Sequence, residues 1–244
     1  KSTLMKVLSG VYPHAEYEGR LLWQGAEQAF SGIRDSEALG IAIIHQELAL
    51  VPLLSIAENL FLGHETARAG IIDWGQAHRR TQALLARVGL KEPPTALVDS
   101  LGVGKQQLVE IAKALAKDVK LLILDEPTAS LNENDSAALL QLLLDLKRQG
   151  VACVLISHKL NEVAQVADTV TVLRDGRSIT TLDCSAGPPG EDTIIRAMVG
   201  REMADRYPRR TPKIGDMLFE LQDWRVHHPA DAQRLVVKGV NLQV

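Results

Sequence analysis

The stretch KLLILDEPTASLN, residues 120–132, joins an aliphatic run to two adjacent carboxylates and a proline. A continuous run of Leu and Ile is typical of a strand that is covered on both faces, as in a parallel sheet. Such a strand places Asp125 and Glu126 at its carboxyl end, the edge where open α/β sheets gather their ligands. Asp125 can then hold a divalent cation and Glu126 can polarise a water molecule. The alternative, that both acids only cap the turn before Pro127, is the less favoured one.

Three other apolar runs have the same character: GIAIIHQ (40–46), VACVLISH (151–158) and DTVTVLRDG (168–176). Between two of these strands, the sequence NENDSAALLQLLLDLKRQG begins at a possible N-cap, Asn132, and stops at Gly150. A second helix is predicted over KQQLVEIAKALAK (105–117), which carries an apolar stripe. The pattern predicts an α/β fold built around a buried parallel sheet.

The remaining segments predict a helical insert and a second domain. Residues 47–104 have helical spacing and little β-branched alternation, whereas the segment after 176 is polar and rich in turn residues. Residues 201–216 are a charged linker candidate, and residues 217–244 have the alternation of the first strands of another domain. The chain starts at Lys1 and stops within a predicted strand, so we expect both ends to be incomplete modules.

Composition narrows the function classes. A net charge of -3 over 244 residues gives no clustered basic footprint for nucleic acid or anionic lipid. The two cysteines, Cys153 and Cys184, form no CxxC pair, which favours a reduced chain with Cys153 as a core thiol. No stretch of the sequence has the 18 or more apolar residues of a membrane span, so any membrane role is expected to be peripheral.

The first three residues, KST, match the tail of the phosphate loop G-x-x-x-x-G-K-[ST]. In this interpretation Lys1 reaches the β- and γ-phosphates, Ser2 ligates Mg²⁺, and the dipole of the following helix favours the anion. The glycines of the motif would precede residue 1, so this half is inferred. Lys-Ser-Thr is also an ordinary helix start, and that alternative stays open.

Three further features appear in a fixed order along the chain. LGVGKQQ (101–107) opens a helix with glycines that let backbone N–H groups approach a phosphate, Gln46 follows one predicted strand, and His158 follows another. His158 could hydrogen-bond a γ-phosphate, and Gln46 could contact the metal or the attacking water. Each feature alone is also typical of an ordinary loop residue; their order makes coincidence improbable.

The ordered set KST, Gln46, LGVGKQQ, LLILDEPTASLN and ISH resembles the nucleotide-binding domain of ABC transporters over nearly all of residues 1–200. More narrowly, GIAIIHQELALVPLLSIAENLFLG, QQLVEIAKAL and PTASLNENDS are similar to the ATP-binding subunits of bacterial monosaccharide importers of the ribose, galactose and xylose type. The resemblance implies a P-loop NTPase (RecA-like) core with a parallel sheet, a small antiparallel β part and an inserted helical subdomain. It also implies that residues 217–244 open a second such domain.

The resemblance implies the site residues as well. ATP and Mg²⁺ are the expected ligands. The residues expected to be catalytic are Glu126, His158 and Gln46. Those expected to bind nucleotide are Lys1, Ser2, Thr3, Leu101, Gly102, Val103, Gly104, Lys105 and Gln106, the last six closing over ATP held by the second domain. The residues expected to serve the metal are Ser2, Gln46 and Asp125.

The function implied by the resemblance is ATP hydrolysis that powers monosaccharide import, at the cytoplasmic face of the inner membrane. The implied partners are two membrane-spanning permease subunits, the second ABC domain of the same chain and, indirectly, a periplasmic sugar-binding protein; no nucleic acid is expected. The alternatives are a nucleotide-binding regulatory module that does not hydrolyse ATP and an ABC-class ATPase unconnected with transport. The sequence leaves the sugar open.

One position departs from the family pattern. The segment LGVGKQQ corresponds to the signature of the family. The second residue of the signature is usually Ser, whose hydroxyl bonds the γ-phosphate, and here it is Gly102, with Lys105 where Gln is common. A hydrogen bond to a charged group contributes about 1.5–3 kcal/mol. We therefore expect the composite site that uses this signature to be the weaker one, unless the charge of Lys105 compensates.

Overall fold

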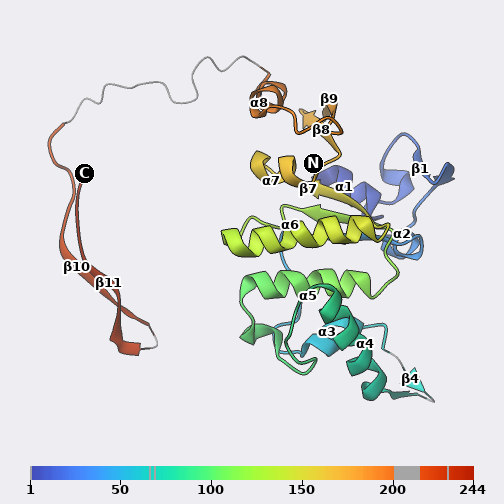
Figure 1. The fold of residues 1–244 in the computed structure, drawn as a ribbon, viewed down its shortest axis with the longest axis horizontal. Coiled ribbons are helices and arrows are strands. Elements are labelled where there is room, and N and C mark those ends of the chain that lie inside the picture. The colour runs from blue at the N-terminus through green and yellow to red at the C-terminus, as the bar shows by residue number, and fades with distance from the viewer. Residues whose placement is uncertain (1, 66, 69, 201–214, 230) are drawn as a thin grey trace. The chain divides into compact units, whose positions relative to one another are not determined.

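The computed structural model describes residues 2–65, 67–68, 70–200, 215–229 and 231–244. The chain divides into two compact units, Lys1–Arg201 and Glu202–Val244. The predicted linker, 201–216, lies almost entirely outside the described residues. Each unit is therefore described by itself (Figure 1).

Three strands of the first unit, β3 (Ile41–Ile44), β6 (Leu121–Asp125) and β7 (Ala152–Ile156), form a parallel sheet in the order β3–β6–β7. Leu124 of β6 lies opposite the last residue of β3 on one side and opposite Leu155 of β7 on the other. Because this register is in step, the carboxyl ends of all three strands finish at the same edge of the sheet.

The larger hydrophobic core lies on one face of this sheet. The helices α5 (Val103–Leu115) and α6 (Glu133–Arg148) pack against Leu122 and Leu124 of the central strand (Figure 1). Both leucines have no exposed surface, and α6 adds a row of buried leucines at helical spacing. Burial of each such side chain stabilises the fold by about 1.5–3 kcal/mol.

The opposite face of the sheet carries a smaller core. Ile123, the residue between those two leucines, packs there with Met5 of α1 (Ser2–Leu8), Phe30 and Ile156. Successive residues of a strand point to opposite faces, so an unbroken apolar run can serve both cores. The expectation that the 119–126 strand is covered on both sides is confirmed.

The local sequence explains where α6 begins and ends. The Asn132 side chain accepts a hydrogen bond from the Asp135 backbone N–H at 2.9 Å, as an N-cap does. Gly150 then adopts a φ of +87°, which favours glycine and lets the chain turn into β7. This helix was predicted at these positions. The other helix of the core, α5, starts at Val103, two residues before the predicted start at 105.

Residues 47–104, which were predicted to be a helical insert, contain α3 (Ile56–Phe61) and α4 (Trp74–Arg87) as their main elements, and the last two of these residues begin α5. A capping box between Ser55 and Glu58 starts α3. The insert also contains a short hairpin of β4 (Ala67–Arg68) and β5 (Ile71–Ile72), which the helical spacing did not predict. The further elements of the first unit are η1 (His14–Glu16), β1 (Leu21–Trp23), β2 (Ala26–Gln28), α2 (Ile33–Ala38), η2 (Val98–Ser100), α7 (Leu160–Val166) and α8 (Glu191–Val199).

The prediction for the fourth apolar run was wrong. β8 (Thr169–Arg174) is not part of the parallel sheet but pairs antiparallel with β9 (Arg177–Asp183), in a segment that was expected to be turn-rich. The connection is the dipeptide Asp175–Gly176, with φ values of 49° and 76°. Two positive φ values in a two-residue loop are characteristic of a tight hairpin turn, for which Asp-Gly is a strong signal.

The strand β7 also differs from the expectation of full coverage. Its residues alternate, with Ala152 and Val154 exposed, while Cys153 and Leu155 pack against the larger core. The thiol of Cys153 is partly buried, and burial raises its pKa. This fits the expected core thiol on a strand at the border of the three-stranded sheet.

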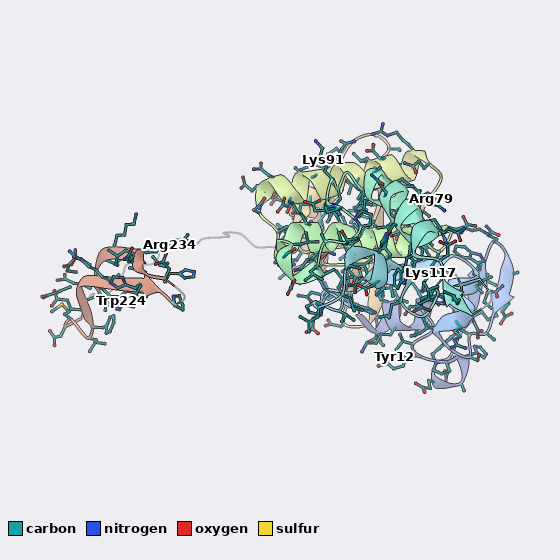
Figure 2. The ribbon with its side chains drawn as sticks, turned by 90° about the horizontal axis from the view of Figure 1, so that it is seen from below. Tyr12, Arg79, Lys91, Lys117, Trp224 and Arg234 are labelled. Atoms are coloured by element: carbon teal, nitrogen blue, oxygen red, sulfur yellow. The ribbon has the colours of Figure 1, made fainter. Side chains whose placement is uncertain are left out.

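The second unit consists of β10 (Glu220–His228) and β11 (Asp231–Gln243), which pair antiparallel with several bulges. Trp224 and Val240 are among its exposed apolar side chains, as Figure 2 shows for Trp224. An isolated two-stranded ribbon is at best marginally stable in water. Both segments form strands as expected; that they open a second nucleotide-binding domain stays a prediction.

Candidate functional site

The predicted site residues on the sheet follow directly from the strand ends. Glu126 comes one residue after β6, His158 two residues after β7 and Gln46 two residues after β3. Since the three strands run in register, these residues gather at one edge. Gln46 is exposed there, and it has room to reach a ligand.

The structure brings two of the expected catalytic side chains into contact. Oε2 of Glu126 lies 3.3 Å from Nδ1 of His158. The Glu126 side chain is 29% exposed and the imidazole is 58% exposed, so both reach the surface of the edge. A carboxylate in this position can accept a proton from a water molecule, and catalytic hydrogen bonds often shorten only when substrate binds.

The backbone of Glu126 is in an unusual conformation. Its φ is 48°, in the left-handed region, which costs a residue with a Cβ about 1–2 kcal/mol. Its N–H donates to the Ile156 carbonyl oxygen at 2.9 Å, which fixes the residue against the end of β7. Strain of this kind persists only where the surroundings hold it, and it is enriched at functional sites.

The donor set around Asp125 fits a magnesium ion. Asp125 and Gln46 offer a carboxylate and an amide oxygen, and Mg²⁺ prefers hard oxygen ligands. Within the described part of the chain, no group of three or more His, Cys, Asp or Glu residues could hold a metal ion. Mg²⁺ is usually bound by one or two carboxylates together with substrate phosphates, so a single Asp is sufficient for a shared metal.

The structure describes only part of the predicted phosphate loop. Lys1 lies outside the described residues, and Ser2 is described only as the first residue of α1. Thr3 is exposed in the first turn of that helix. Their roles toward nucleotide and metal stay predictions.

The signature residues form the start of α5. Gly102 is the N-cap of this helix, in an extended conformation, and it is exposed together with Val103. The first N–H groups of a helix have no intrahelical acceptor, and the helix dipole adds positive potential there. This end of α5 is thus suited to an anion. The Leu101 side chain, in contrast, is buried in the larger core, so only its backbone is left to contact nucleotide.

Two signature side chains are bonded to the preceding loop. Nζ of Lys105 pairs with the Glu92 carboxylate at 2.5 Å, and this bond lowers the pKa of Glu92. Nε2 of Gln106 donates to the carbonyl oxygens of Val98 at 3.0 Å and Leu101 at 2.9 Å. The charge of Lys105, which could have compensated for the missing hydroxyl, is paired with a carboxylate in this arrangement.

The sequence analysis missed a second contact between α5 and the site. The Ala49 carbonyl oxygen accepts from Nζ of Lys113 at 3.1 Å. Glu110 is 8% exposed, and burial raises its pKa. The Lys113 bond holds the loop that follows Gln46 against α5, the helix that starts within LGVGKQQ. The sequence did contain a signal for a buried polar contact of α5, because VEIAKAL places an acid among apolar residues.

Comparisons with known proteins show the family of this chain. The family described as ABC transporter matches residues 1–129. The chain is 60% identical over its whole length to the L-arabinose transport ATP-binding protein AraG of Geobacillus stearothermophilus and covers 48% of it. It is 51% identical over 241 residues to the xylose import ATP-binding protein XylG of Escherichia coli strain K12, which is 99% of this chain and 46% of that protein. The chain therefore spans about half the length of the curated relatives it matches.

Solved structures show the same fold. An ATP-binding cassette of an ABC transporter in its ADP conformation aligns with a TM-score of 0.70 at 21% identity, over 82% of this chain and 84% of that one. A component of the cbiONQ ABC transporter complex from Clostridium perfringens aligns with a TM-score of 0.65 at 25% identity, over 85% and 79% of the two chains. The expected fold class, a P-loop NTPase core with small antiparallel sheets and a helical subdomain, is confirmed. Among the described residues, we find no helix with the length and apolar character needed to span a membrane.

The two signature glycines are expected to respond differently to substitution by Ser. Nothing lies near a Cβ added at Gly102, whose backbone is extended, and Ser is a better N-cap than Gly by a few tenths of a kcal/mol. A Cβ at Gly104 would collide with the side chain of Asp135, which Asn132 holds at 2.8 Å. In urea unfolding, Gly102→Ser should therefore be neutral or slightly stabilising, whereas Gly104→Ser should cost about 0.5–1.5 kcal/mol, because Asp135 must move and lose its bond to Asn132. Equal stability of the two variants would contradict this packing.

The buried acid of α5 gives a prediction on pH. Because burial raises the pKa of Glu110, its contribution to stability is greatest below the ordinary value of 4.5 and is lost as the pH rises through the raised pKa. Gln resembles the protonated acid and does not titrate. The unfolding free energy of Glu110→Gln relative to the parent should therefore increase as the pH rises above 4.5, as measured by urea titrations. A difference that is constant with pH, or larger in acid, would be incompatible with a raised pKa.

Proposed function

The chain belongs to the ABC transporter family, and from this premise we propose that it binds ATP and hydrolyses it to power the import of a monosaccharide across the bacterial inner membrane. The observation that carries the hydrolytic part is the contact of 3.3 Å between Glu126 and His158 at the carboxyl edge of the sheet. The sugar class rests on two relatives, which are named for L-arabinose transport and xylose import.

The proposed mechanism assigns each group at the edge a task. Glu126 accepts the proton of the attacking water. His158 directs Nδ1 toward Glu126. In the imidazolium form both ring nitrogens donate, so Nε2 can then hydrogen-bond the terminal phosphate. Asp125, Gln46 and Ser2 would hold Mg²⁺, which when bound neutralises phosphate charge. Phosphoryl transfer needs mainly such positioning and charge stabilisation from the protein.

The signature end of α5 is proposed to serve a different ATP. We expect Leu101–Gln106 to close over the nucleotide of the second ABC domain in the same chain, with the backbone N–H groups of Val103 and Gly104 facing its phosphates. The pairing of Lys105 with Glu92 supports the view that this composite site is the weaker one. Hydrolysis would then depend mainly on Glu126.

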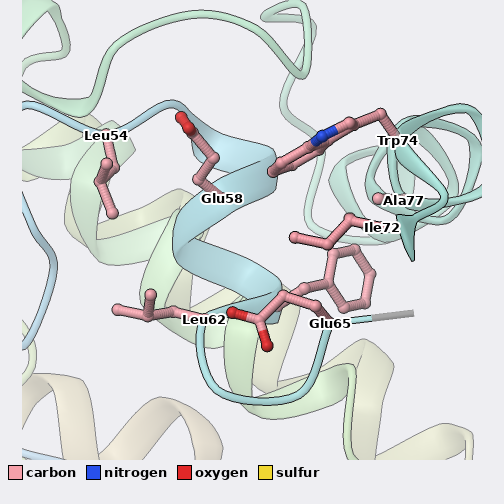
Figure 3. A pocket seen from close by; sticks show the side chains of 8 residues that line it. Leu54, Glu58, Leu62, Glu65, Ile72, Trp74 and Ala77 are labelled. Atoms are coloured by element: carbon pink, nitrogen blue, oxygen red, sulfur yellow. The ribbon is translucent and has the colours of Figure 1, made fainter. Parts of the chain in front are cut away.

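The proposed membrane partners are two permease subunits, reached through the helical insert at the cytoplasmic face. Leu53 and Ile71 of this insert are 77% and 76% exposed. A cavity of about 160 Å³ lies nearby, lined by Leu54, Leu62 and Trp74 among others (Figure 3). The insert starts directly after the loop of Gln46, so docking there could respond to nucleotide. A periplasmic sugar-binding protein would act indirectly, through the permease.

The base assignment is tested with Glu126→Gln in the natural full-length protein. Loss of a general base should lower the rate of ATP hydrolysis about 10²- to 10⁴-fold while bound ATP is retained. Steady-state phosphate release and nucleotide retention on a desalting column measure the two quantities. Glu16→Gln, an exposed carboxylate of η1, is the matched control. Unchanged turnover in Glu126→Gln would favour the alternative of a regulatory nucleotide holder.

The docking surface is tested with Leu53→Asp. Because Leu53 is 77% exposed, the substitution should change stability by no more than about 0.5 kcal/mol. Burial of a charge in the interface should nevertheless weaken binding to the permease subunits about tenfold or more, measured by co-purification from detergent. Leu22→Asp, which is 58% exposed on β1, serves as the control. Equal co-purification of Leu53→Asp and the parent would place the interface elsewhere.

A further inference from the structure

A buried polar cluster lies directly behind the catalytic edge. The hydroxyl of Thr128 donates to Oε2 of Glu162 at 2.5 Å, and the Thr128 carbonyl oxygen accepts from Nζ of Lys159 at 2.8 Å. The same ammonium lies 3.2 Å from Oε1 of Glu162. Thr128 is 1% exposed and Glu162 is 5% exposed. The mechanism above uses none of these groups.

The cluster joins the two segments that carry the reacting side chains. Thr128 is two residues after Glu126, and Lys159 is the residue after His158. Glu162 belongs to the first turn of α7, the helix that follows β7 (Figure 1). Both carboxylate oxygens of Glu162 are occupied, and so are both polar groups of the Thr128 residue that face α7.

A second contact joins the same two segments on the other side of the site. The Glu126 N–H donates to the Ile156 carbonyl oxygen. Glu126 is therefore held by a hydrogen bond at its own N–H and by another two residues later, at Thr128. In the same way, hydrogen-bonded residues, Ile156 and Lys159, lie on both sides of His158 in the sequence. The contact of 3.3 Å between the two catalytic side chains is thus flanked by hydrogen bonds on both sides.

Stability alone is a poor explanation for this cluster. A buried ion pair is often no more stable than well-packed apolar residues of the same volume, whereas its hydrogen bonds restrict geometry closely. Glu126 has a left-handed backbone, which needs such restriction to persist.

We propose that Thr128, Glu162 and Lys159 are positioning residues that hold the segment of Glu126 against the segment of His158, so that the carboxylate and the imidazole act on the same phosphate. This inference rests on the proposed function, since it assigns the cluster a task in ATP hydrolysis. The cluster acts through Glu126 and His158 and does not itself touch nucleotide.

The experiment compares Thr128→Val and Thr128→Ser in the natural full-length protein. Val keeps the shape but removes the hydroxyl, so kcat should fall about ten- to hundredfold, as expected for a displaced catalytic group, while KM for ATP changes by no more than about twofold. Thr128→Ser keeps the hydroxyl, so its kcat should be close to that of the parent. Thr81→Val is the matched control, because Thr81 is also fully buried but bonds only within α4, at 2.9 Å to Ala77. This control should leave kcat unchanged.

Amide hydrogen exchange supplies a readout that does not require turnover. Thr128→Val should accelerate exchange of the Glu126 N–H, whereas Thr81→Val should not. If Thr128→Val does not fold, Lys159→Met replaces it, because that side chain is 31% exposed and its removal is less disruptive; Lys159→Arg is then the conservative partner.

The outcomes separate the two proposals. The positioning role would be overturned if folded Thr128→Val had the kcat of the parent, or if Thr128→Ser had a kcat as low as that of Thr128→Val. Neither outcome affects the test of hydrolysis with Glu126→Gln. If the parent itself hydrolyses no ATP, the proposed function fails, and exchange at Glu126 decides the inference. Unchanged exchange in Thr128→Val would then overturn it, and faster exchange would support it.

Discussion

The site depends on the in-register parallel pairing of β6 with β3 and β7. This pairing carries the residues after each strand to one edge, where Glu126 meets His158 and Gln46 lies close to the same boundary. The pairing is itself a product of burial, because the side chains of β6 alternate between two cores and fix the strand from both faces. A shift of one residue would exchange the two faces and lose both cores, so the position of the proposed catalytic carboxylate is determined by hydrophobic packing.

Polar contacts fix the loops at the ends of the strands, which apolar packing alone does not position. The hydrogen bond from Lys113 to Ala49 holds the loop of Gln46 against α5, and the Thr128–Glu162–Lys159 cluster joins the segments after β6 and β7. The first contact connects the loop of Gln46 to a helix, and the second connects the segments that carry Glu126 and His158. Buried charges are costly unless they are partnered, which makes their geometry specific. In this arrangement the apolar cores place the strands and the polar contacts place the loops at their ends.

The surfaces of the chain divide in a similar way. The edge of the sheet is polar and suited to phosphate and metal, whereas the insert exposes large aliphatic side chains such as Leu53 and Ile71. A single loop, which begins at Gln46, connects these two surfaces. This continuity gives a physical basis for the proposed coupling between bound nucleotide and a membrane partner. A ligand shifts a conformational equilibrium only through contacts that differ between the two conformations, and the loop after Gln46 could supply such contacts.

The sequence by itself determined the local features: the strand that ends in Asp125 and Glu126, the helix capped by Asn132 and stopped at Gly150, and the glycine-rich start of α5. These follow from periodicity and capping, which act over a few residues. Only the tertiary structure decided that β8 pairs with β9, that Lys105 is paired with Glu92, and that Glu162 meets Thr128 across 34 positions. The pairing of β8 had a local signal in Asp175–Gly176. The other two contacts had none, because they depend on which loops the packing of distant elements brings together.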